Sequence, residues 1–294
     1  MSHFAIASMQ LALPYGNNLE AIGDEIVKTK KRFPWVDMVV LSELASFGPE
    51  KKYAEAMPSD TEQFYCALAK AHDLWIIPGS HYETVNENGD DKIYNTTSVI
   101  NNHGEVIERY RKVYPFMPYE SGIEPGKDFV VFDVPQGRIG VAICYDLWFP
   151  EVARAMACLG AEAMVYPTLT GTIDRPLELL MAQSTAVCNQ CYVFAINGAG
   201  DIGNGKSIAV GPDGSVLFEA GTGQEVNPIE IDFELVRRNR ERGIMGLGQP
   251  LKSFRDNPVV FPQYQAVNGQ LNIKQNFNAL DKLGPLEIPA KAKD

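Results

Sequence analysis

The sequence predicts a layered α/β fold in a single domain. Short apolar runs rich in β-branched residues alternate with longer stretches of helical period, and this alternation is typical of layered α/β architecture. The chain has 294 residues, of which 45% are hydrophobic, so it can bury a sizeable core. Its length fits one large domain better than two ordinary ones, and we place that domain at residues 1–255.

The first predicted elements alternate strand and helix. Strands are expected at 4–11, 37–42 and 74–77, and helices at 17–33 and 59–73. Asn17 or Asn18 is placed to cap the first helix. Ser59 is placed to cap the second, with Glu62 three residues further on as in a capping box. A turn at Pro78 ends this part of the chain.

The middle of the chain predicts a hairpin and then a strand followed by a helix. The hairpin spans Tyr94 to Arg111 and turns at 101–104, where Asn and Gly tolerate positive φ. A short strand at 139–144 is expected to end at Cys144. Pro150 can open the next helix, because its missing N–H costs nothing in the first turn.

The last third of the chain continues the alternation and then changes in composition. The expected elements are a strand at 163–166, a helix at 176–189, a strand at 192–197, a hairpin turning at 211–214, a strand at 228–231 and a helix at 234–242. After about Arg255 the sequence is polar, contains prolines and has weak periodicity. We therefore predict a C-terminal tail or arm at 256–294, able to contact a neighbouring subunit or to stay mobile.

The overall charge and the N-terminus narrow the classes of partner. The formal net charge is −11, which gives no electrostatic reason to bind nucleic acid or an anionic membrane surface. The first ten residues lack the basic flank and long apolar stretch of a secretion signal, and no run of about 18 apolar residues occurs. We expect a cytoplasmic protein with no nucleic-acid and no membrane partner.

The cysteines do not form a disulfide framework. Five of them, Cys66, Cys144, Cys158, Cys188 and Cys191, are too few and too irregularly spaced for one in a chain of this size. Cys188 and Cys191 have the spacing of a redox or half-zinc motif, but there is no second pair and no nearby histidine. We interpret this pair as a buried helix-to-strand junction and expect reduced thiols and no bound metal.

Three reactive residue types follow three predicted strands. Glu43, Lys112 and Cys144 each come at the C-terminal end of one strand, and such ends converge on a common crevice in layered α/β folds. A thiol needs a base to become a nucleophile, and a carboxylate can take its proton. A nearby ammonium lowers the thiol pKa and can hold negative charge that develops on a carbonyl oxygen. Together these residues predict a nucleophilic site without histidine.

Three segments carry a resemblance to a known family. SELASFGP (42–49), YRKVYPFMPYESGIEPG (110–126) and GVAICYDLWFPEVARAMACLGAEAMVYPT (140–168) resemble the three signature regions of the nitrilase superfamily, and the likeness spans roughly residues 4–250. The resemblance implies a four-layer αββα sandwich and a Glu-Lys-Cys site with no metal and no cofactor. It also implies a homo-oligomer, a dimer or dimer-based, in which the nucleophile-bearing faces stack.

The resemblance also implies a role for each site residue. Cys144 attacks the substrate carbonyl and forms an acyl-thioester, while Glu43 takes the thiol proton, passes it to ammonia and later activates water. Lys112 and the backbone N–H of Tyr145 stabilise the oxyanion. Glu120, eight residues after Lys112, matches a second glutamate that orients substrate in amidases of the superfamily.

Residues around Cys144 indicate which carbon–nitrogen bond is cleaved. The triplet Cys144-Tyr145-Asp146 resembles the amide-hydrolysing branches, whereas true nitrilases typically have Cys-Trp-Glu. Carbamoyl-amino-acid hydrolases have arginines where this chain has Leu147 and Trp148, so an anionic substrate is disfavoured. We expect an apolar pocket near these residues.

The substrate-binding residues that we expect are Tyr145, Trp148 and Thr168. CYDLWFPEVARAM is similar to N-carbamoylputrescine amidases, whereas RKVYPFMPYESGIEPG is closer to aliphatic amidases and formamidases. We predict hydrolysis of a small aliphatic primary amide by water to carboxylate and ammonia. The alternatives are an N-carbamoyl amine amidohydrolase, a catalytically silent binding protein of the same fold, and a thiol redox protein that uses Cys188 and Cys191.

Overall fold

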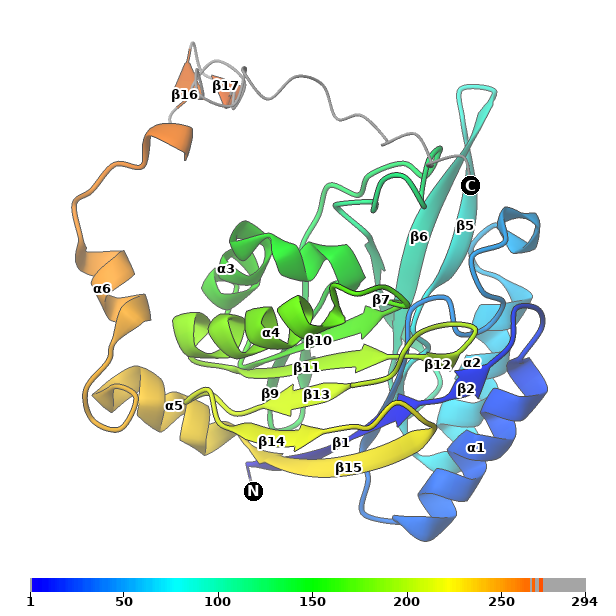
Figure 1. Cartoon of the computed structure of the whole chain (residues 1–294), viewed down its shortest axis with the longest axis horizontal. Coiled ribbons are helices and arrows are strands. Elements are labelled where there is room, and N and C mark those ends of the chain that lie inside the picture. Colours follow the sequence, from blue (N-terminus) through cyan, green and yellow to red (C-terminus); the bar gives the residue numbers. More distant parts are fainter. Residues whose placement is uncertain (1, 265, 268–269, 272–294) are drawn as a thin grey trace.

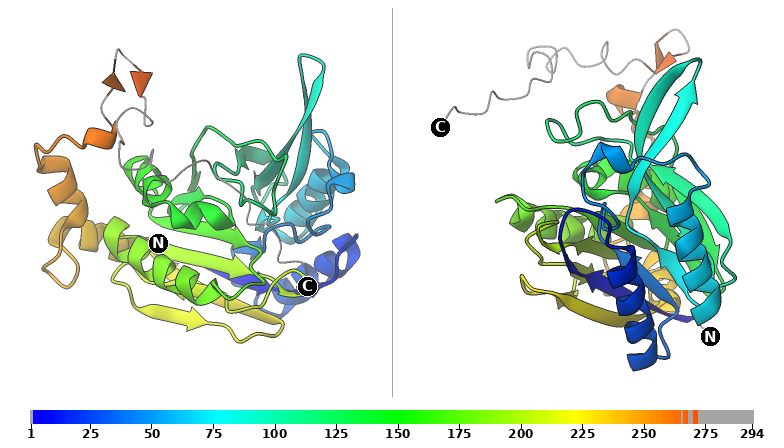
Figure 2. Two further views of the ribbon diagram at one scale, coloured as in Figure 1. Left: turned by 45° about the horizontal axis from the view of Figure 1, so that its top comes forward. Right: turned by 90° about the vertical axis from the view of Figure 1, so that its right-hand side faces the viewer.

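Two β-sheets lie face to face, and a pair of helices covers the outer face of each, in a computed structural model that describes residues 2–264, 266–267 and 270–271 (Figures 1 and 2). Helices α1 and α2 pack on one sheet, and α3 and α4 pack on the other. The predicted four-layer αββα sandwich is confirmed. No helix of the described residues is long and apolar enough to cross a membrane.

The first sheet carries the strand that leads to Glu43. Its order is β15-β1-β3-β4-β6-β5, with β7 paired to β6, and β1, β3 and β4 run parallel. Because β3 ends at Leu41, Glu43 lies just beyond the C-terminal edge of this sheet. The strands are β1 His3–Gln10, β3 Met38–Leu41, β4 Trp75–Ile77, β5 His81–Glu87, β6 Asp90–Ile100, β7 Val106–Arg111 and β15 Glu225–Asp232.

The second sheet carries the strand that leads to Cys144. Its order is β14-β13-β11-β10-β9-β8, and β9, β10 and β11 run parallel. Their C-terminal ends meet at one edge, as expected for parallel strands. The strands are β8 Val130–Val134, β9 Gly137–Val141, β10 Ala163–Thr168, β11 Tyr192–Asn197, β13 Ile208–Val210 and β14 Val216–Glu219.

The helices and the short elements complete the chain. The α-helices are α1 Leu19–Arg32, α2 Asp60–His72, α3 Pro150–Cys158, α4 Arg175–Asn189, α5 Phe233–Arg242 and α6 Pro250–Asp256. The 3-10 helices are η1 Lys51–Tyr53, η2 Cys144–Trp148 and η3 Pro262–Tyr264, and two-residue strands are β2 Ala12–Leu13, β12 Ala199–Gly200, β16 Ala266–Val267 and β17 Gln270–Leu271.

Strand β3 shows why the central strands read as continuous apolar runs. Its Met38 and Val40 belong to the core between the two sheets, whereas Val39 and Leu41 belong to the core under α1 and α2. All four side chains are fully buried, because a parallel strand with a layer on each side has no solvent face. This packing anchors the strand end from which Glu43 projects.

The predicted caps of α1 and α2 are confirmed in part. Ser59 caps α2 by accepting a hydrogen bond from the Glu62 N–H at 3.0 Å, as predicted. The Glu62 carboxylate does not complete a capping box, because it binds Ser98 at 2.6 Å and Arg109 at 2.7 and 2.8 Å. At α1 the N-cap residue is Asn18, whose side chain makes no cap hydrogen bond, whereas the Asn17 side chain accepts from the Leu19 N–H at 3.0 Å.

Other elements were not predicted at all. Strand β5 is largely polar, and its edge position in the sheet explains why it lacks an apolar signal. Helix α6 forms just before the predicted tail and places Leu251 against the core. Residues 272–294 of that tail lie outside the described residues.

Candidate active site

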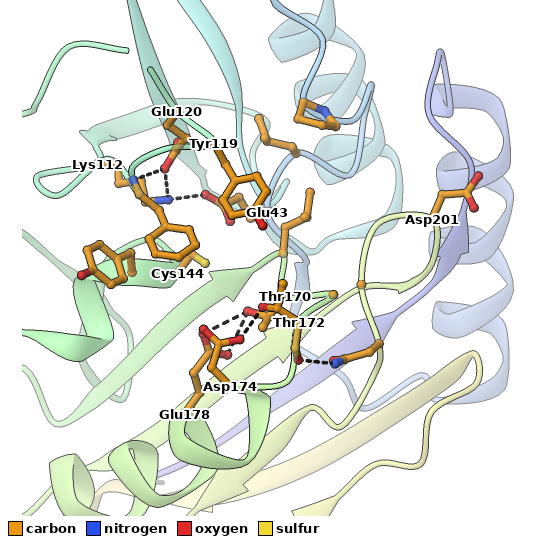
Figure 3. A pocket seen from close by; sticks show the side chains of 18 of the residues that line it. Glu43, Lys112, Tyr119, Glu120, Cys144, Thr170, Thr172, Asp174, Glu178 and Asp201 are labelled. Atoms are coloured by element: carbon orange, nitrogen blue, oxygen red, sulfur yellow. Dashed lines mark hydrogen bonds and ion pairs between the residues drawn. The ribbon is translucent and has the colours of Figure 1, made fainter. Parts of the chain in front are cut away.

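A cavity of about 450 Å³ opens where the C-terminal edges of the two sheets meet. Glu43, Lys112, Glu120 and Cys144 all line it, and Figure 3 shows their side chains gathered on one side. These residues come from three separate segments of the chain, because Lys112 and Glu120 share the loop after β7. The structure therefore brings together the four residues that the sequence singled out for catalysis.

Cys144 lies in a turn rather than at the end of a strand. Strand β9 ends at Val141, and Cys144 is the first residue of η2, so the predicted strand end is corrected. Its φ of 47° is in the left-handed region, which costs a non-glycine residue on the order of 1–3 kcal/mol. The turn therefore has to be held by contacts around it.

Asp146 supplies those contacts. Its buried carboxylate accepts hydrogen bonds from the Ile143 N–H at 3.0 Å, the Tyr114 N–H at 2.9 Å and the Tyr110 hydroxyl at 2.7 Å. The first bond closes the nucleophile turn, and the other two reach β7 and the loop after Lys112. One aspartate thus fixes Cys144 relative to Lys112.

A buried charge network surrounds Lys112, whose exposed fraction is only 1%. The ammonium donates to Glu43 Oε1 at 2.7 Å and to Glu120 Oε2 at 2.5 Å. Asn95 Nδ2 donates to both carboxylates, each at 2.8 Å. An ammonium has three N–H donors, so Lys112 keeps one for a further acceptor.

The surroundings of the Glu43 carboxylate raise its pKa. Burial raises the pKa of Glu43, the neighbouring Glu120 charge raises it further, and the Lys112 ammonium opposes both without cancelling them. The Cys144 thiol lies close enough to lower the pKa of Glu43 slightly. Glu43 is therefore in place to remove the thiol proton and is a stronger base than an ordinary glutamate.

The thiol itself rests in its protonated form. Burial and the Glu43 charge hold the pKa of Cys144 well above its usual value, although Lys112 lowers it. Burial lowers the pKa of Lys112, but the Glu43 and Glu120 charges more than offset this and hold that pKa well above its usual value. The arrangement suits proton transfer from thiol to carboxylate beside a permanent cation.

The raised pKa of Glu43 predicts that activity falls on the acid side of the pH profile. Because only the ionised carboxylate can accept the thiol proton, kcat/KM should fall as pH drops through a pKa above the ordinary glutamate value of about 4.3. Glu120→Gln removes the like charge, so its limb should move to lower pH. A pH profile of both proteins checks this, and a wild-type limb at or below about pH 4.3 would contradict it.

The predicted substrate-binding residues do not all line the cavity. Tyr145 and Trp148 do, on the η2 turn. Thr168 is fully buried behind the wall, where its carbonyl accepts from the Glu43 N–H at 3.1 Å and its hydroxyl lies 3.4 Å from Arg175 Nη1. The residues that follow it line the cavity instead: Leu169, Thr170, Gly171 and Thr172.

Two residues of the site were missed from the sequence. Asn95 lies in β6 between Tyr94 and Thr96, in the half of the strand that is buried. The signal in the sequence was a polar amide in that buried half. Glu178, on the first turn of α4, lines the cavity, and no pattern in the sequence links it to the site. The place of both residues in the site is evident only from the folded structure, in which the ends of these strands and helices lie close together.

The site offers little to hold a metal. Glu43 and Glu120 already share the Lys112 ammonium, and the described part of the chain contains no group of three His, Cys, Asp or Glu side chains arranged around an ion. The CNQC pair lies at the junction of α4 and β11, where Cys188 is exposed and Cys191 is buried. Burial raises the pKa of Cys191 to about 12, which disfavours thiolate chemistry there.

Comparison with known proteins gives consistent results. The sequence profile of the family described as carbon-nitrogen hydrolase matches residues 6–241. Omega-amidase NIT3 of Saccharomyces cerevisiae is 34% identical over 247 residues, covering 76% of this chain and 84% of the relative. Human omega-amidase NIT2 is 32% identical over 213 residues, covering 67% and 75%. The crystal structure of Saccharomyces cerevisiae Nit3, a member of branch 10 of the nitrilase superfamily, superposes with a TM-score of 0.75 at 33% identity, covering 82% and 94%.

Proposed function

This chain belongs to the carbon–nitrogen hydrolase family of the nitrilase superfamily, and we propose that it converts a small aliphatic primary amide to a carboxylate and ammonia through an acyl-thioester on Cys144. Amide hydrolysis is common to the omega-amidase relatives. The identity of the acyl group and the role of each residue are the proposal. The observation that carries it is the Glu43, Lys112 and Cys144 cluster on one wall of a small cavity.

The acylation half of the reaction uses all three residues. Glu43 takes the Cys144 proton as Sγ bonds to the amide carbon, and the carbonyl oxygen becomes an oxyanion. The remaining N–H of Lys112 and the backbone N–H of Tyr145, which as the second residue of η2 has no partner within the turn, stabilise that charge. The carbon–nitrogen bond then breaks, and Glu43 gives its proton to the leaving ammonia.

The deacylation half repeats these steps with water. Glu43 takes a proton from water as the oxygen attacks the thioester carbon, and the same donors hold the oxyanion. The carbon–sulfur bond breaks, the carboxylic acid leaves, and the proton returns to the Cys144 sulfur. Glu120 acts throughout by orienting Lys112, to which it is bound at 2.5 Å.

The lining of the cavity supports an amide without a carboxylate of its own. Among the described lining residues Lys112 is the only cation, and Trp148 stands where carbamoyl-amino-acid hydrolases have an arginine. A bound carboxylate would lose its hydration without gaining a cationic partner. Aromatic and aliphatic side chains instead suit a short alkyl chain.

An ammonia-release screen tests this proposal. Butyramide and other short amides should release ammonia, whereas short nitriles should not, and Cys144→Ala should serve as the blank. The alternative, an N-carbamoyl amine amidohydrolase, is supported by the CYDLWFPEVARAM segment and predicts ammonia from carbamoyl amines but not from simple amides. That pattern would reject the aliphatic amide, and an equal signal from the blank would reject the mechanism.

A further inference from the structure

Building on the proposed function, we propose that Glu178 determines specificity by selecting small primary amides that carry an amino group at the far end of the acyl chain. Glu178 lies on α4, across the cavity from Glu120 and Lys112 (Figure 3). A substrate whose amide carbon is at Cys144 therefore extends between two walls that both carry carboxylates. The amide end contacts the catalytic wall, and the other end meets Glu178.

The Glu178 carboxylate is held rigidly by Arg175. Arg175 Nη1 donates to Glu178 Oε2 at 2.6 Å, and its Nη2 donates to the carbonyl oxygens of Ala195 at 3.2 Å and Lys206 at 2.8 Å. Arg175 is fully buried and does not line the cavity, so a substrate meets the carboxylate and not the guanidinium. This ion pair orients Glu178 without presenting a positive charge to the substrate.

One oxygen of Glu178 keeps capacity for another donor. The Thr170 hydroxyl lies 3.0 Å from Oε1 and 2.9 Å from Oε2, but it has a single proton to share between them. Trp148 Nε1 is 3.5 Å from Oε1, a distance at which a hydrogen bond is weak. Oε1 is therefore under-used, although only 3% of the Glu178 surface is exposed. A buried acceptor of this kind gains from a charged donor.

The rest of the cavity favours a cation over an anion. Asp174 and Asp201 also line it, and Lys112, the one cation among the described lining residues, already donates to two carboxylates. Aromatic rings that can stabilise an ammonium through their faces complete the lining: Tyr15, Tyr82, Phe116, Tyr119, Tyr145 and Trp148. The field inside the cavity thus attracts an ammonium and repels a carboxylate.

Three matched amides test the inference on the wild-type enzyme. γ-Aminobutyramide, butyramide and succinamate are chains of similar size that end in an ammonium, a methyl group and a carboxylate. A charged hydrogen bond predicts kcat/KM for γ-aminobutyramide roughly ten- to a hundredfold above butyramide, with succinamate lower still. Turnover of butyramide with no advantage for γ-aminobutyramide, or faster turnover of succinamate, would overturn it. No turnover of any of the three would instead count against the proposed function.

A substitution assigns the selectivity to Glu178. Glu178→Gln keeps the shape but removes the charge, so the ratio of kcat/KM for γ-aminobutyramide to kcat/KM for butyramide should fall about tenfold or more. Glu20→Gln, the same change at an exposed position on α1, should keep the wild-type ratio. An unchanged ratio in Glu178→Gln would show that Glu178 serves only to pair Arg175.

A measurement on the wild type covers the case in which Glu178→Gln folds poorly. Propylammonium and propionate have similar size and opposite charge, and either can compete with butyramide for the cavity. Propylammonium should inhibit butyramide turnover at concentrations at least about tenfold below those at which propionate does. Equal inhibition, or stronger inhibition by propionate, would contradict the selection of a cation.

Discussion

Cys144→Ala should lower amide hydrolysis to the background rate. Loss of the nucleophile in hydrolases that form a covalent intermediate costs on the order of a millionfold in kcat. The fold should remain, because the change removes one buried sulfur and leaves Asp146 to hold the turn through Ile143 and Tyr114. Ammonia release and the circular dichroism spectrum, measured on the same sample, check both parts.

The other thiols provide matched controls. Cys188→Ser changes an exposed thiol on α4, and Cys191→Ala changes a buried one next to it. Both variants should keep amide hydrolysis within about threefold of wild type, since neither residue lines the cavity. If the two substitutions are combined and activity is lost while Cys144 is intact, the thiol redox alternative is favoured. Retention of activity in Cys144→Ala would reject the assignment of Cys144 as the nucleophile.

Lys112→Met should remove both activity and stability. Losing one oxyanion donor costs about 100- to 1,000-fold in rate. The variant also leaves Glu43 and Glu120 buried without their shared cation, and breaking a buried charge pair in this way costs roughly 3–5 kcal/mol in the free energy of unfolding. Lys127→Met, the same change on an exposed loop, should alter neither. Ammonia release and chemical denaturation give the two values.

A double variant separates the two effects of Lys112. In Lys112→Met with Glu120→Gln only one of the two carboxylates that Lys112 neutralises remains, so a substantial part of the lost stability should return. Activity should stay at least about 100-fold down, because the oxyanion donor is still missing. Recovery of activity together with stability would show that Lys112 acts by holding the fold and not by stabilising the oxyanion.

The residues that follow parallel strands could be anticipated from the sequence. Glu43 comes after β3 and Cys144 after β9, and the ends of parallel strands in the two sheets meet at the cavity. Topology alone therefore brings these two residues close. The sequence could not show that Lys112 would contact both Glu43 and Glu120, since that depends on the path of the loop after β7.

Residues whose partners are distant in the chain could not be anticipated. Glu62 reads as half of a capping box, but its carboxylate pairs with Arg109 on β7, because that ion pair between helix and sheet outweighs a local bond. Asn95 contacts the catalytic carboxylates only after β6 is placed in the same sheet as β3, with β4 between them. Thr168 is a predicted substrate-binding residue, yet its hydroxyl lies 3.4 Å from Arg175 Nη1.

The local conformation of the turn at Cys144 also could not be predicted from the sequence. An apolar run through Cys144 predicts a strand to its end, but Asp146 draws the Ile143 N–H out of the sheet and starts η2. The positive φ of Cys144 follows from that turn and from no property of cysteine. A short acidic side chain just after an apolar strand was the available signal.

Direct detection of the acyl-thioester tests the central claim. Wild-type protein mixed with butyramide, quenched rapidly in acid and digested should give a peptide that carries a butyryl group on Cys144, as identified by mass spectrometry. The group should disappear as the substrate is consumed. Ammonia release without any acylated peptide, or with the group on another cysteine, would contradict the assignment of Cys144 as the nucleophile.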